Sequence, residues 1–412
     1  MPELKPFRAW RYATQDLVAV TAPPYDVLSD AQVAAYAARD AHNIVHVDVP
    51  PQTPAGYAGA AATLHAWMGD GTIVRDRCLL PGRIPSLTLY RLSFTDATGA
   101  SRQVIGVLGA LAVMDYPVAG AHRDTSAVLP HENVTKKAST DRLDLTRATG
   151  CNLSPVWGLS LASGLTEYLQ QIWVYMDDGG GVHASLTEDG VTHEIFVVDE
   201  DFVIADIQAL MRSADVLIAD GHHRYGVAQQ YRDERRAAGE PEGGPASFTL
   251  GFINELVDDQ LSVEAIHRVY DGISFDALRD ALAGCFDLSP APEPTPAMLA
   301  EMKAQGRLVL LAPDGTATWL TPKPGAFAGV RELDGALLEH ALAGVDGLTV
   351  TYEHELDEIL AGLSRHTGAV LIRPTSIDEI RRTATEGLLM PPKSTFFTPK
   401  LRTGLVIRQL DE

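Results

Sequence analysis

One hexapeptide of the sequence concentrates residues that bind anions and transfer protons: residues 220–225, DGHHRY. It directly follows the apolar run 216–219, VLIA, which is typical of a buried strand, and apolar residues at helical spacing follow it. We therefore expect a glycine at a strand-to-helix corner, with the first amides of the helix directed at whatever occupies that corner. Such amides, together with the helix dipole, attract phosphate or carboxylate.

Each polar side chain of this hexapeptide has a chemical role available to it. Arg224, in the first helical turn, can bind two oxygens of one anion. His222 and His223 can donate hydrogen bonds or transfer protons near neutral pH, so His223 is also a candidate catalytic residue. Asp220 can orient a histidine, cap the helix or hold hydrated Mg²⁺. Cations in the first turn of a helix oppose its dipole, so these residues do not stabilise the helix, and a functional role for the hexapeptide as a whole is favoured. For either histidine taken singly, a purely structural role stays open.

A second concentration of candidate residues lies in the basic stretch 121–150, within an otherwise acidic chain. Its segment 129–133, LPHEN, contains Glu132 and His131, either of which is a candidate general base for a substrate hydroxyl. The cations that follow are candidate phosphate contacts, namely Lys136, Lys137, Arg142 and Arg147. The alternative interpretation is a solvated charged loop and helix.

Two proline-containing segments are candidate walls of the same pocket. In 22–26, APPYD, the prolines enforce a turn, and Asp26 is expected near Mg²⁺ or the substrate, where it can activate a hydroxyl. In 390–395, MPPKST, Lys393 and Ser394 are expected to close over the bound anion. A rigid turn and a packed tail are the corresponding structural alternatives.

The elements expected around these motifs mix hairpins with strand–helix alternation. Hairpins are predicted over 86–116 and at Asp189-Gly190, and a capping box at 29–32, SDAQ, begins a helix that extends to about Asp40. Further predicted elements are short strands at 17–20 and 44–49, and helices at 55–68, 206–213 and 221–238. This mixture favours an α+β or mixed α/β fold over one doubly wound sheet.

The composition restricts the partners of the protein. Its 412 residues include 54 acidic and 33 basic ones, for a formal net charge of −21. Nucleic-acid binding needs a basic surface to replace counterions, so no nucleic acid is expected as a partner. Any anion site in so acidic a protein must be formed locally, by backbone amides and a few clustered cations. No apolar run approaches the ~20 residues that span a bilayer, so no membrane association is expected. The absence of a signal peptide and the widely spaced cysteines predict a cytoplasmic protein.

The hexapeptide resembles the Gly-His-Arg box of the ParB and sulfiredoxin superfamily. Members bind a nucleoside di- or triphosphate at this turn, and they include CTP-dependent partition proteins, ATP-using sulfiredoxins and free-serine kinases. A wider resemblance is to the bacterial and archaeal family called domain of unknown function 1015, which has no settled activity and whose genes lie near serine-biosynthesis genes. Seven separated motifs carry it, in order: 22–27, 129–133, 141–143, 147–149, 152–158, 220–225 and 390–395.

The resemblance implies a nucleotide-binding core of the ParB/sulfiredoxin type, formed by an N-terminal α/β segment, residues 1–85, and by residues 206–290, which contain the hexapeptide. A large β-rich region, 86–205, is then inserted between them, and 291–412 form a C-terminal α/β region and tail. The implied function is a phosphotransferase that uses ATP or ADP with Mg²⁺ on a small hydroxylated metabolite, with free serine as a candidate. Two alternatives stay open: a nucleotide-binding regulator without turnover, and a metal-assisted phosphate-ester hydrolase. No feature specifies an oligomeric state.

Overall fold

The computed structural model describes residues 1–76, 85–96, 99–117, 125–130, 139–179, 183–391 and 393–411. The chain divides into two compact units. Unit 1 comprises Met1–Ser262, Thr383–Leu388 and Pro399–Glu412, and unit 2 comprises Val263–Arg382 and Leu389–Thr398. Both combine strands with helices, so the predicted mixed α/β class is confirmed. Within these ranges, no helix is long and apolar enough to cross a membrane.

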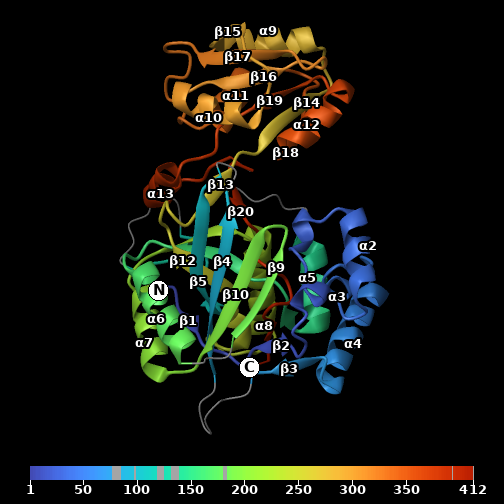
Figure 1. Ribbon diagram of the computed structural model, residues 1–412, viewed down its shortest axis with the longest axis vertical. Helices are drawn as coiled ribbons and strands as arrows, with labels where there is room; N and C mark the ends of the chain where they lie inside the picture. Colours follow the sequence, from blue (N-terminus) through green and yellow to red (C-terminus); the bar gives the residue numbers. More distant parts are fainter. Residues whose placement is uncertain are drawn as a thin grey trace. The chain divides into compact units, whose positions relative to one another are not determined.

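Unit 1 is built on one large sheet that contains both parallel and antiparallel strand pairs (Figure 1). The described strands follow the order β6-β11-β8-β12-β5-β4-β10-β9, and β1 pairs with β5. Strands of the predicted β-rich region and of the predicted core therefore alternate within one sheet and share one hydrophobic core. The strands are β1 (Leu4–Lys5), β4 (Leu87–Thr95), β5 (Ser101–Ala112), β6 (Val128–Leu129), β8 (Val156–Ser160), β9 (His183–Glu188), β10 (Val191–Val198), β11 (Val216–Asp220) and β12 (Phe248–Glu255).

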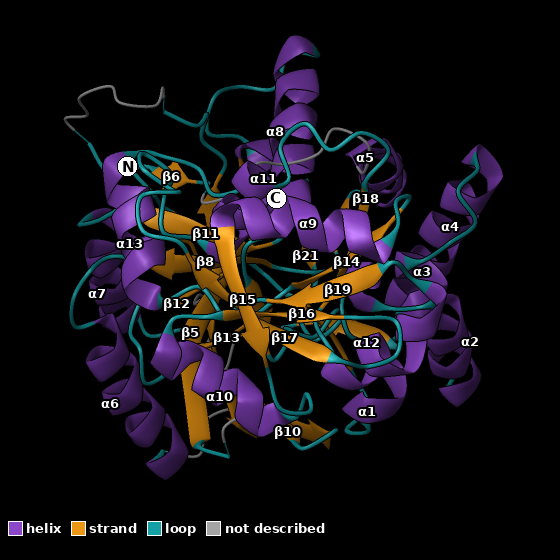
Figure 2. Cartoon of the chain, turned by 90° about the horizontal axis from the view of Figure 1, so that it is seen from above, coloured by secondary structure: helices purple, strands orange, loops and turns teal. Residues whose placement is uncertain are grey.

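Helices cover both sides of this sheet. Figures 1 and 2 show α6 (Leu165–Asp178) and α7 (Asp201–Arg212) on one side, and α2 (Asp30–Arg39), α4 (Pro54–Asp70) and α5 (Ser139–Thr149) on the other. α8 (His222–Ala237) packs against α5 and against β8 and β12. The remaining elements of unit 1 are short: β2 (Trp10–Tyr12), β3 (Ile73–Arg75), α1 (Leu17–Val20), the 3-10 turn η1 (Tyr25–Val27), α3 (Val45–Asp48), β7 (Cys151–Asn152), η3 (Pro245–Ser247) and β21 (Arg408–Gln409).

Several predicted elements are confirmed by their local chemistry. The Ser29 side chain and Gln32 form the reciprocal capping box that begins α2. β9 and β10 pair as an antiparallel hairpin through Asp189 and Gly190, whose φ angles of 49° and 76° suit a tight hairpin turn. The predicted hairpin over 86–116 is the β4–β5 pair.

Two segments predicted as strands, 17–20 and 44–49, are instead short helices, so those predictions were wrong. The Asp16 side chain accepts a hydrogen bond from the Ala19 amide at the start of α1. Likewise, the Asn43 side-chain oxygen accepts from the Val45 amide at the start of α3. Because these side chains satisfy first-turn amides, local capping outweighs the β propensity of the short Val- and Ile-rich runs.

Unit 2 has helices on both faces of a six-stranded sheet of order β15-β17-β16-β19-β14-β18, counted over the described residues. Alternate residues of β16 enter different cores: Leu308 and Leu310 pack with α9 and α11, whereas Val309 and Leu311 pack with α10 and α12. The elements are β14 (His267–Asp271), α9 (Phe275–Cys285), β15 (Phe286–Pro290), α10 (Pro296–Gln305), β16 (Leu308–Leu311), β17 (Ala317–Pro322), α11 (Asp334–Ala341), β18 (Thr349–Glu353), α12 (Leu356–Gly362), η4 (Leu363–Arg365) and β19 (Gly368–Leu371).

The chain crosses between the two units four times, after Ser262, Arg382, Leu388 and Thr398. β13 (Ser262–Glu264) lies at the first passage, and α13 (Ile377–Glu386) spans the second. β20 (Phe396–Thr398) pairs with β13 and ends where the chain re-enters unit 1 at Pro399. The C-terminal residues of unit 1 therefore follow directly from unit 2 in the chain.

Candidate functional site

The predicted corner is present in unit 1: β11 ends at Asp220, and α8 begins after Gly221, which is its N-cap. The register between β11 and β8 shifts between Ile218 and Asp220, a local bulge that turns the strand end. Gly221 adopts φ 83° and ψ 28°, in the left-handed region that favours glycine. A Cβ atom at this position would lie 3.0 Å from Cζ and 3.1 Å from Nε of Arg224. Glycine is therefore required both by the backbone and by the guanidinium that folds back over it.

Arg224 is held by protein groups on two of its three guanidinium nitrogens. Its side chain is only 10% exposed. Nη1 donates to the carbonyl oxygen of Pro155, and Nη2 donates to Oδ2 of Asp220 at 3.0 Å and lies 3.9 Å from Oδ2 of Asp26. The buried Nε atom makes no hydrogen bond to any residue that the structure describes. In this arrangement Nε, beside Gly221, is the guanidinium nitrogen that has no partner among the described residues.

Asp220 lies between two cations. Its Oδ2 faces Arg224, and its Oδ1 is 3.4 Å from Nζ of Lys400, which approaches from the C-terminal residues of unit 1. Burial by itself would raise the pKa of Asp220, but Lys400 and Arg224 hold that pKa below its usual range. Both carboxylate oxygens therefore face a cation, and the magnesium role of Asp220 stays a prediction. Among the described residues, no group of three or more His, Cys, Asp or Glu side chains could hold a metal.

A second charge cluster is centred on Arg142 of α5. Its Nη1 donates to the carbonyl oxygen of Asp48 at 2.7 Å, and its Nε donates to Oδ2 of Asp141 at 3.0 Å. The guanidinium also lies 3.9 Å from the ring centroid of Tyr25. Burial raises the pKa of Asp48 despite Arg142 and Arg224, and burial, followed by Asp26, raises the pKa of Tyr25 to about 12. Arg142 therefore joins η1, α3 and α5.

A cavity of about 60 Å³ lies between the two clusters. Its charged lining comes from Asp48, Arg142 and Arg224, and its apolar lining comes largely from α5, α8 and β12. It is small beside ligand pockets of ~300–1,000 Å³, so it fits a small group and not a whole nucleotide. Residues from four of the motifs contribute to the lining: Tyr25 from 22–27, Arg142 from 141–143, Asn152, Leu153 and Ser154 from 152–158, and Arg224 from 220–225.

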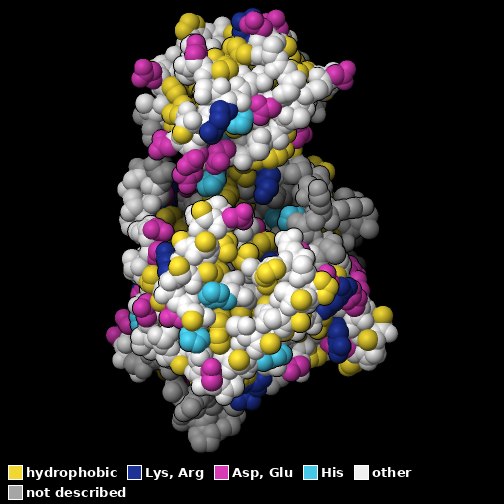
Figure 3. Space-filling view, turned by 90° about the vertical axis from the view of Figure 1, so that its right-hand side faces the viewer, with side chains coloured by type: hydrophobic (Ala, Val, Ile, Leu, Met, Phe, Trp, Pro, Cys, Tyr) yellow, Lys and Arg dark blue, Asp and Glu magenta, His cyan; other side chains and the backbone are white. Residues whose placement is uncertain are grey.

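Figure 3 shows how charged side chains are distributed over one face of the molecule. Acidic side chains are spread over it, and Lys and Arg occur singly or in small groups between them. The three cations around Asp220 and Asp48 are instead gathered on the inside of unit 1, where their side chains are 9–13% exposed. A locally built cationic site is what the overall charge of −21 requires of an anion-binding protein.

The structure brings some predicted site residues together and leaves others apart. Asp26, Arg142 and Asp220–Arg224 all lie in unit 1, with His222 buried and His223 half-buried at the start of α8. Glu132, His131, Lys136 and Lys137 lie outside the described residues. Arg147 is exposed and pairs with Asp144 and Glu234.

Lys393 and Ser394 belong to unit 2, whereas the corner belongs to unit 1. The Ser394 hydroxyl donates to the carbonyl oxygen of Pro391 at 2.7 Å, and the carbonyl oxygen of Lys393 accepts from Arg268 at 3.2 Å. These bonds hold the segment within unit 2. This agrees with the alternative interpretation of residues 390–395 as a packed tail.

Two residues of the site were missed from the sequence. Asp48 lies within the predicted strand 44–49, although an aspartate at the end of an apolar run is a signal of a buried polar contact. Lys400 lies in a C-terminal stretch without a recognisable pattern, and its partner Asp220 is 180 residues away in the chain. No local signal identifies such a contact.

Comparison with known proteins gives a family and several remote structural likenesses. The family model described as "Protein of unknown function (DUF1015)" matches residues 4–336. No curated protein matches the sequence.

Among solved structures, a conserved hypothetical protein from Pyrococcus furiosus is 12% identical, with a TM-score of 0.35, over 66% of this chain and 87% of that chain. A free serine kinase in complex with AMP is 12% identical, with a TM-score of 0.36, over 69% and 92%. SbnI from Staphylococcus aureus, with a C-terminal truncation, is 13% identical, with a TM-score of 0.37, over 71% and 84%. With TM-scores this low, the function must be argued from the residues of this chain.

Proposed function

The chain belongs to the family described as protein of unknown function (DUF1015), and because that description names no reaction, we propose a function from the geometry of unit 1. Unit 1 binds the phosphate groups of ATP or ADP at the Gly221 corner and transfers a phosphoryl group to a small hydroxylated metabolite. The core around this corner is of the ParB/sulfiredoxin type, and the protein acts in the cytoplasm. Serine is the first acceptor to test, because the chain resembles a family whose genes lie near serine-biosynthesis genes.

One observation carries this proposal: the buried Nε–H of Arg224 has no acceptor among the described residues and lies directly beside Gly221. A buried donor without a partner costs about 1–3 kcal/mol, more if it is charged, so an acceptor is expected at this position. A phosphate oxygen is a suitable acceptor, because the start of the 16-residue helix α8 also favours negative charge. The same place cannot be filled by a side chain of residue 221, which is glycine.

The neighbouring groups suit phosphoryl transfer, in which the protein mainly positions and neutralises the reacting groups. Asp26 is 34% exposed, against 23% for Asp220 and 7% for Asp48, so its carboxylate is the most accessible of the three. Asp26 would accept the proton of the acceptor hydroxyl while that oxygen bonds to phosphorus and the bond to the departing nucleotide breaks. Glu132 and His223 are further candidates for this role.

The remaining predicted residues are assigned supporting roles. Arg142, Lys136 and Lys137 would contribute positive charge around the phosphates. Mg²⁺ is commonly bound through one or two carboxylates together with substrate phosphates, and it neutralises charge between them. Of the carboxylates at the site, Asp26 fits that ion better than Asp220 does.

The test uses two matched glycine variants at opposite ends of α8. Gly221 and Gly239 have φ angles of 83° and 97°, so Gly→Ala costs each about 1–2 kcal/mol of backbone strain. Only at Gly221 does the new Cβ meet Arg224, whereas nothing lies within 4 Å of a Cβ at position 239. We expect Gly221→Ala to weaken ADP and ATP binding about tenfold or more, measured by calorimetry, and Gly239→Ala to leave it unchanged.

Turnover is then measured on the wild-type protein with ATP or ADP, Mg²⁺ and a panel of hydroxylated metabolites that begins with serine. A phosphorylated product supports the phosphotransferase. Nucleotide binding without any product would leave a nucleotide-binding protein and remove the transfer reaction. If the wild-type protein binds neither nucleotide, or if both variants bind like wild type, the corner is not the nucleotide site.

A further inference from the structure

The C-terminal residues 399–410, called the C-terminal strap here, run between two segments that border the candidate site. The backbones of Ala22 and Thr403 exchange hydrogen bonds, with the Thr403 amide 2.8 Å from the Ala22 carbonyl oxygen. On the other side, the Gly404 amide donates to Leu153 at 3.0 Å, and the Thr403 hydroxyl bonds to Ser154 at 2.5 Å. The strap therefore joins the proline turn beside Asp26 to the segment that lines the cavity.

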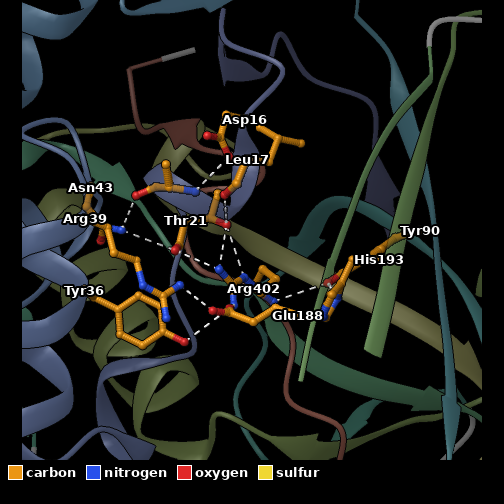
Figure 4. Close-up of polar contacts among 11 residues, drawn as sticks. Asp16, Leu17, Thr21, Tyr36, Arg39, Asn43, Tyr90, Glu188, His193 and Arg402 are labelled. Atoms are coloured by element: carbon orange, nitrogen blue, oxygen red, sulfur yellow. Dashed lines mark hydrogen bonds and ion pairs between the residues drawn. The ribbon is translucent and has the colours of Figure 1, made fainter. Parts of the chain in front are cut away.

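Arg402 fixes the strap inside unit 1 (Figure 4). Its side chain is 4% exposed, and every nitrogen of its guanidinium has a protein acceptor. Nη2 donates to the carbonyl oxygen of Thr21 at 2.7 Å, Nε donates to the Thr21 hydroxyl at 3.1 Å, and Nη1 donates to Glu188. The Arg402 amide also donates to the hydroxyl of Tyr90 at 3.3 Å.

The partners of Arg402 are themselves held in place. Glu188 also accepts hydrogen bonds from Arg39 and from the Tyr36 hydroxyl, so the carboxylate connects α2 to the strap (Figure 4). The hydroxyl of Tyr90 lies 2.7 Å from Nδ1 of His193. Removing a charge from water is costly even when it is paired, so a network of this kind is better explained by the geometry it imposes than by stability.

The consequence of this anchoring lies two residues earlier, at Lys400. The Lys400 ammonium group is 3.4 Å from Oδ1 of Asp220, and Arg224 faces the other oxygen of the same carboxylate. Asp220 is adjacent to Gly221, so an anion at the corner would meet cations from both sides. Lysine has a compact charge on a flexible stem, so one ammonium group can face both Asp220 and a phosphate oxygen at the corner.

We propose that Lys400 is a phosphate-binding residue of the nucleotide site and that Arg402 is the positioning residue that holds the strap so that Lys400 reaches it. This inference rests on the proposed function, because it assumes that the corner binds phosphate. It adds a ligand that lies outside every motif identified from the sequence. The ammonium group of Lys400 is a compact, strongly hydrated charge, whereas the guanidinium of Arg224 is planar. The two cations would therefore bind the same anion with different geometries.

The test compares ADP affinity in Lys400→Met, Lys400→Arg and Lys303→Met, measured by calorimetry at two salt concentrations. Lys303 is an exposed lysine of α10 in unit 2, so its replacement changes the net charge equally. We expect Lys400→Met to weaken ADP binding about tenfold or more and to lessen its salt dependence, Lys400→Arg to restore most of the affinity, and Lys303→Met to have no effect.

The positioning role of Arg402 is tested through non-additivity. If Arg402 acts through Lys400, Arg402→Lys should weaken ADP binding in the wild-type background but not in the Lys400→Met background. Glu188→Gln, which leaves Arg402 in place but removes its charged partner, gives the same comparison if Arg402→Lys does not fold. Equal effects in both backgrounds would overturn the positioning role.

The two proposals fail in different ways. If wild-type protein does not bind ADP, the proposed function is wrong. If wild-type protein binds ADP and Lys400→Met binds it equally well, the nucleotide site stands and Lys400 is not among its ligands.

Discussion

The two units bury charge in different ways, although each contains a large sheet covered by helices. In unit 2, the buried carboxylate of Asp334 accepts from the side chain and the backbone amide of Arg373, and the buried Arg268 donates to the carbonyl oxygens of Ile266 and Lys393. In unit 1, Arg142, Arg224 and Arg402 each contact several groups that come from distant regions of the chain. Unit 2 therefore pairs Arg373 with one carboxylate and Arg268 with backbone carbonyls, whereas in unit 1 Arg142 and Arg224 lie beside the carboxylates of Asp26, Asp48, Asp141 and Asp220.

This difference indicates which unit carries the chemistry. A buried ion pair is weak evidence for stability, because the cost of removing the charges from water offsets much of their attraction. One pair can orient a helix, but several converging cations and carboxylates around a cavity require a further reason. In unit 1 the proposed anion site would supply that reason, and in unit 2 the alternation of apolar residues in β16 and β19 already accounts for the sheet and its helices.

The largest effect is expected for Arg142→Met in unit 1. The change leaves Asp48 buried without its cation, so the free energy of unfolding should fall by about 3–5 kcal/mol. Trp319 is the only one of the five tryptophans that lies in unit 2. Denaturant unfolding followed by tryptophan fluorescence in a Trp319→Phe background therefore reports on unit 1. Arg142→Lys, which keeps the charge, should recover some of the loss.

The matched change in unit 2 is Arg373→Met, followed by the fluorescence of Trp319. Arg373 is 27% exposed, and Asp334 keeps the backbone amide of residue 373, so a smaller loss of about 1–3 kcal/mol is expected. Equal losses in the two units would show that their buried charges are equivalent and would remove the contrast.

An intermediate effect is expected from pH, because both units contain a buried histidine with a lowered pKa, His193 in unit 1 and His267 in unit 2. Burial, with a contribution from Arg402, lowers the pKa of His193 to about 3, and burial, with Arg268, lowers that of His267 to about 4. Below pH ~6.5 the unfolded chain takes up a proton that the folded chain excludes. Stability is therefore fully present above pH ~6.5 and falls with pH until it passes the folded-state pKa.

At pH 5, His193→Gln should thus remove an acid destabilisation of about 2 kcal/mol from unit 1, and His267→Gln should do the same for unit 2. The measurement is the difference in unfolding free energy between variant and wild type at pH 7 and at pH 5. A difference that does not change between pH 7 and pH 5 would contradict the prediction.

The smallest effects are expected for exposed ion pairs, in either unit. Arg147 pairs with Glu234 across α5 and α8 in unit 1, and Arg279 pairs with Asp276 and Asp280 within α9 of unit 2. Both arginines are almost half exposed, so each Arg→Ala change should cost less than about 1 kcal/mol and still less in 1 M salt. A loss at Arg147 comparable to that at Arg142 would mean that burial does not distinguish the clusters.

The regions of the fold that follow from neighbouring residues were predictable. The strand, glycine and helix at 216–238 are specified by an apolar run, a residue that tolerates a positive φ, and helical spacing. The runs at 17–20 and 44–49 show the limit, because four to six apolar residues do not distinguish a strand from one helical turn. There the capping side chains of Asp16 and Asn43 decided the outcome.

The candidate site likewise has a part that neighbouring residues specify and a part that they do not. By itself, the sequence determined the corner at Gly221 and the type of group that suits it, because backbone conformation and helix ends depend on residues within a few positions of one another. Only the tertiary structure decided that Lys400 faces Asp220 and that Asp48 lies beside Arg142. Those contacts join segments that are remote in the chain, and they exist because a shared sheet, with Arg402 anchored to Thr21 and Glu188, brings the segments to one place.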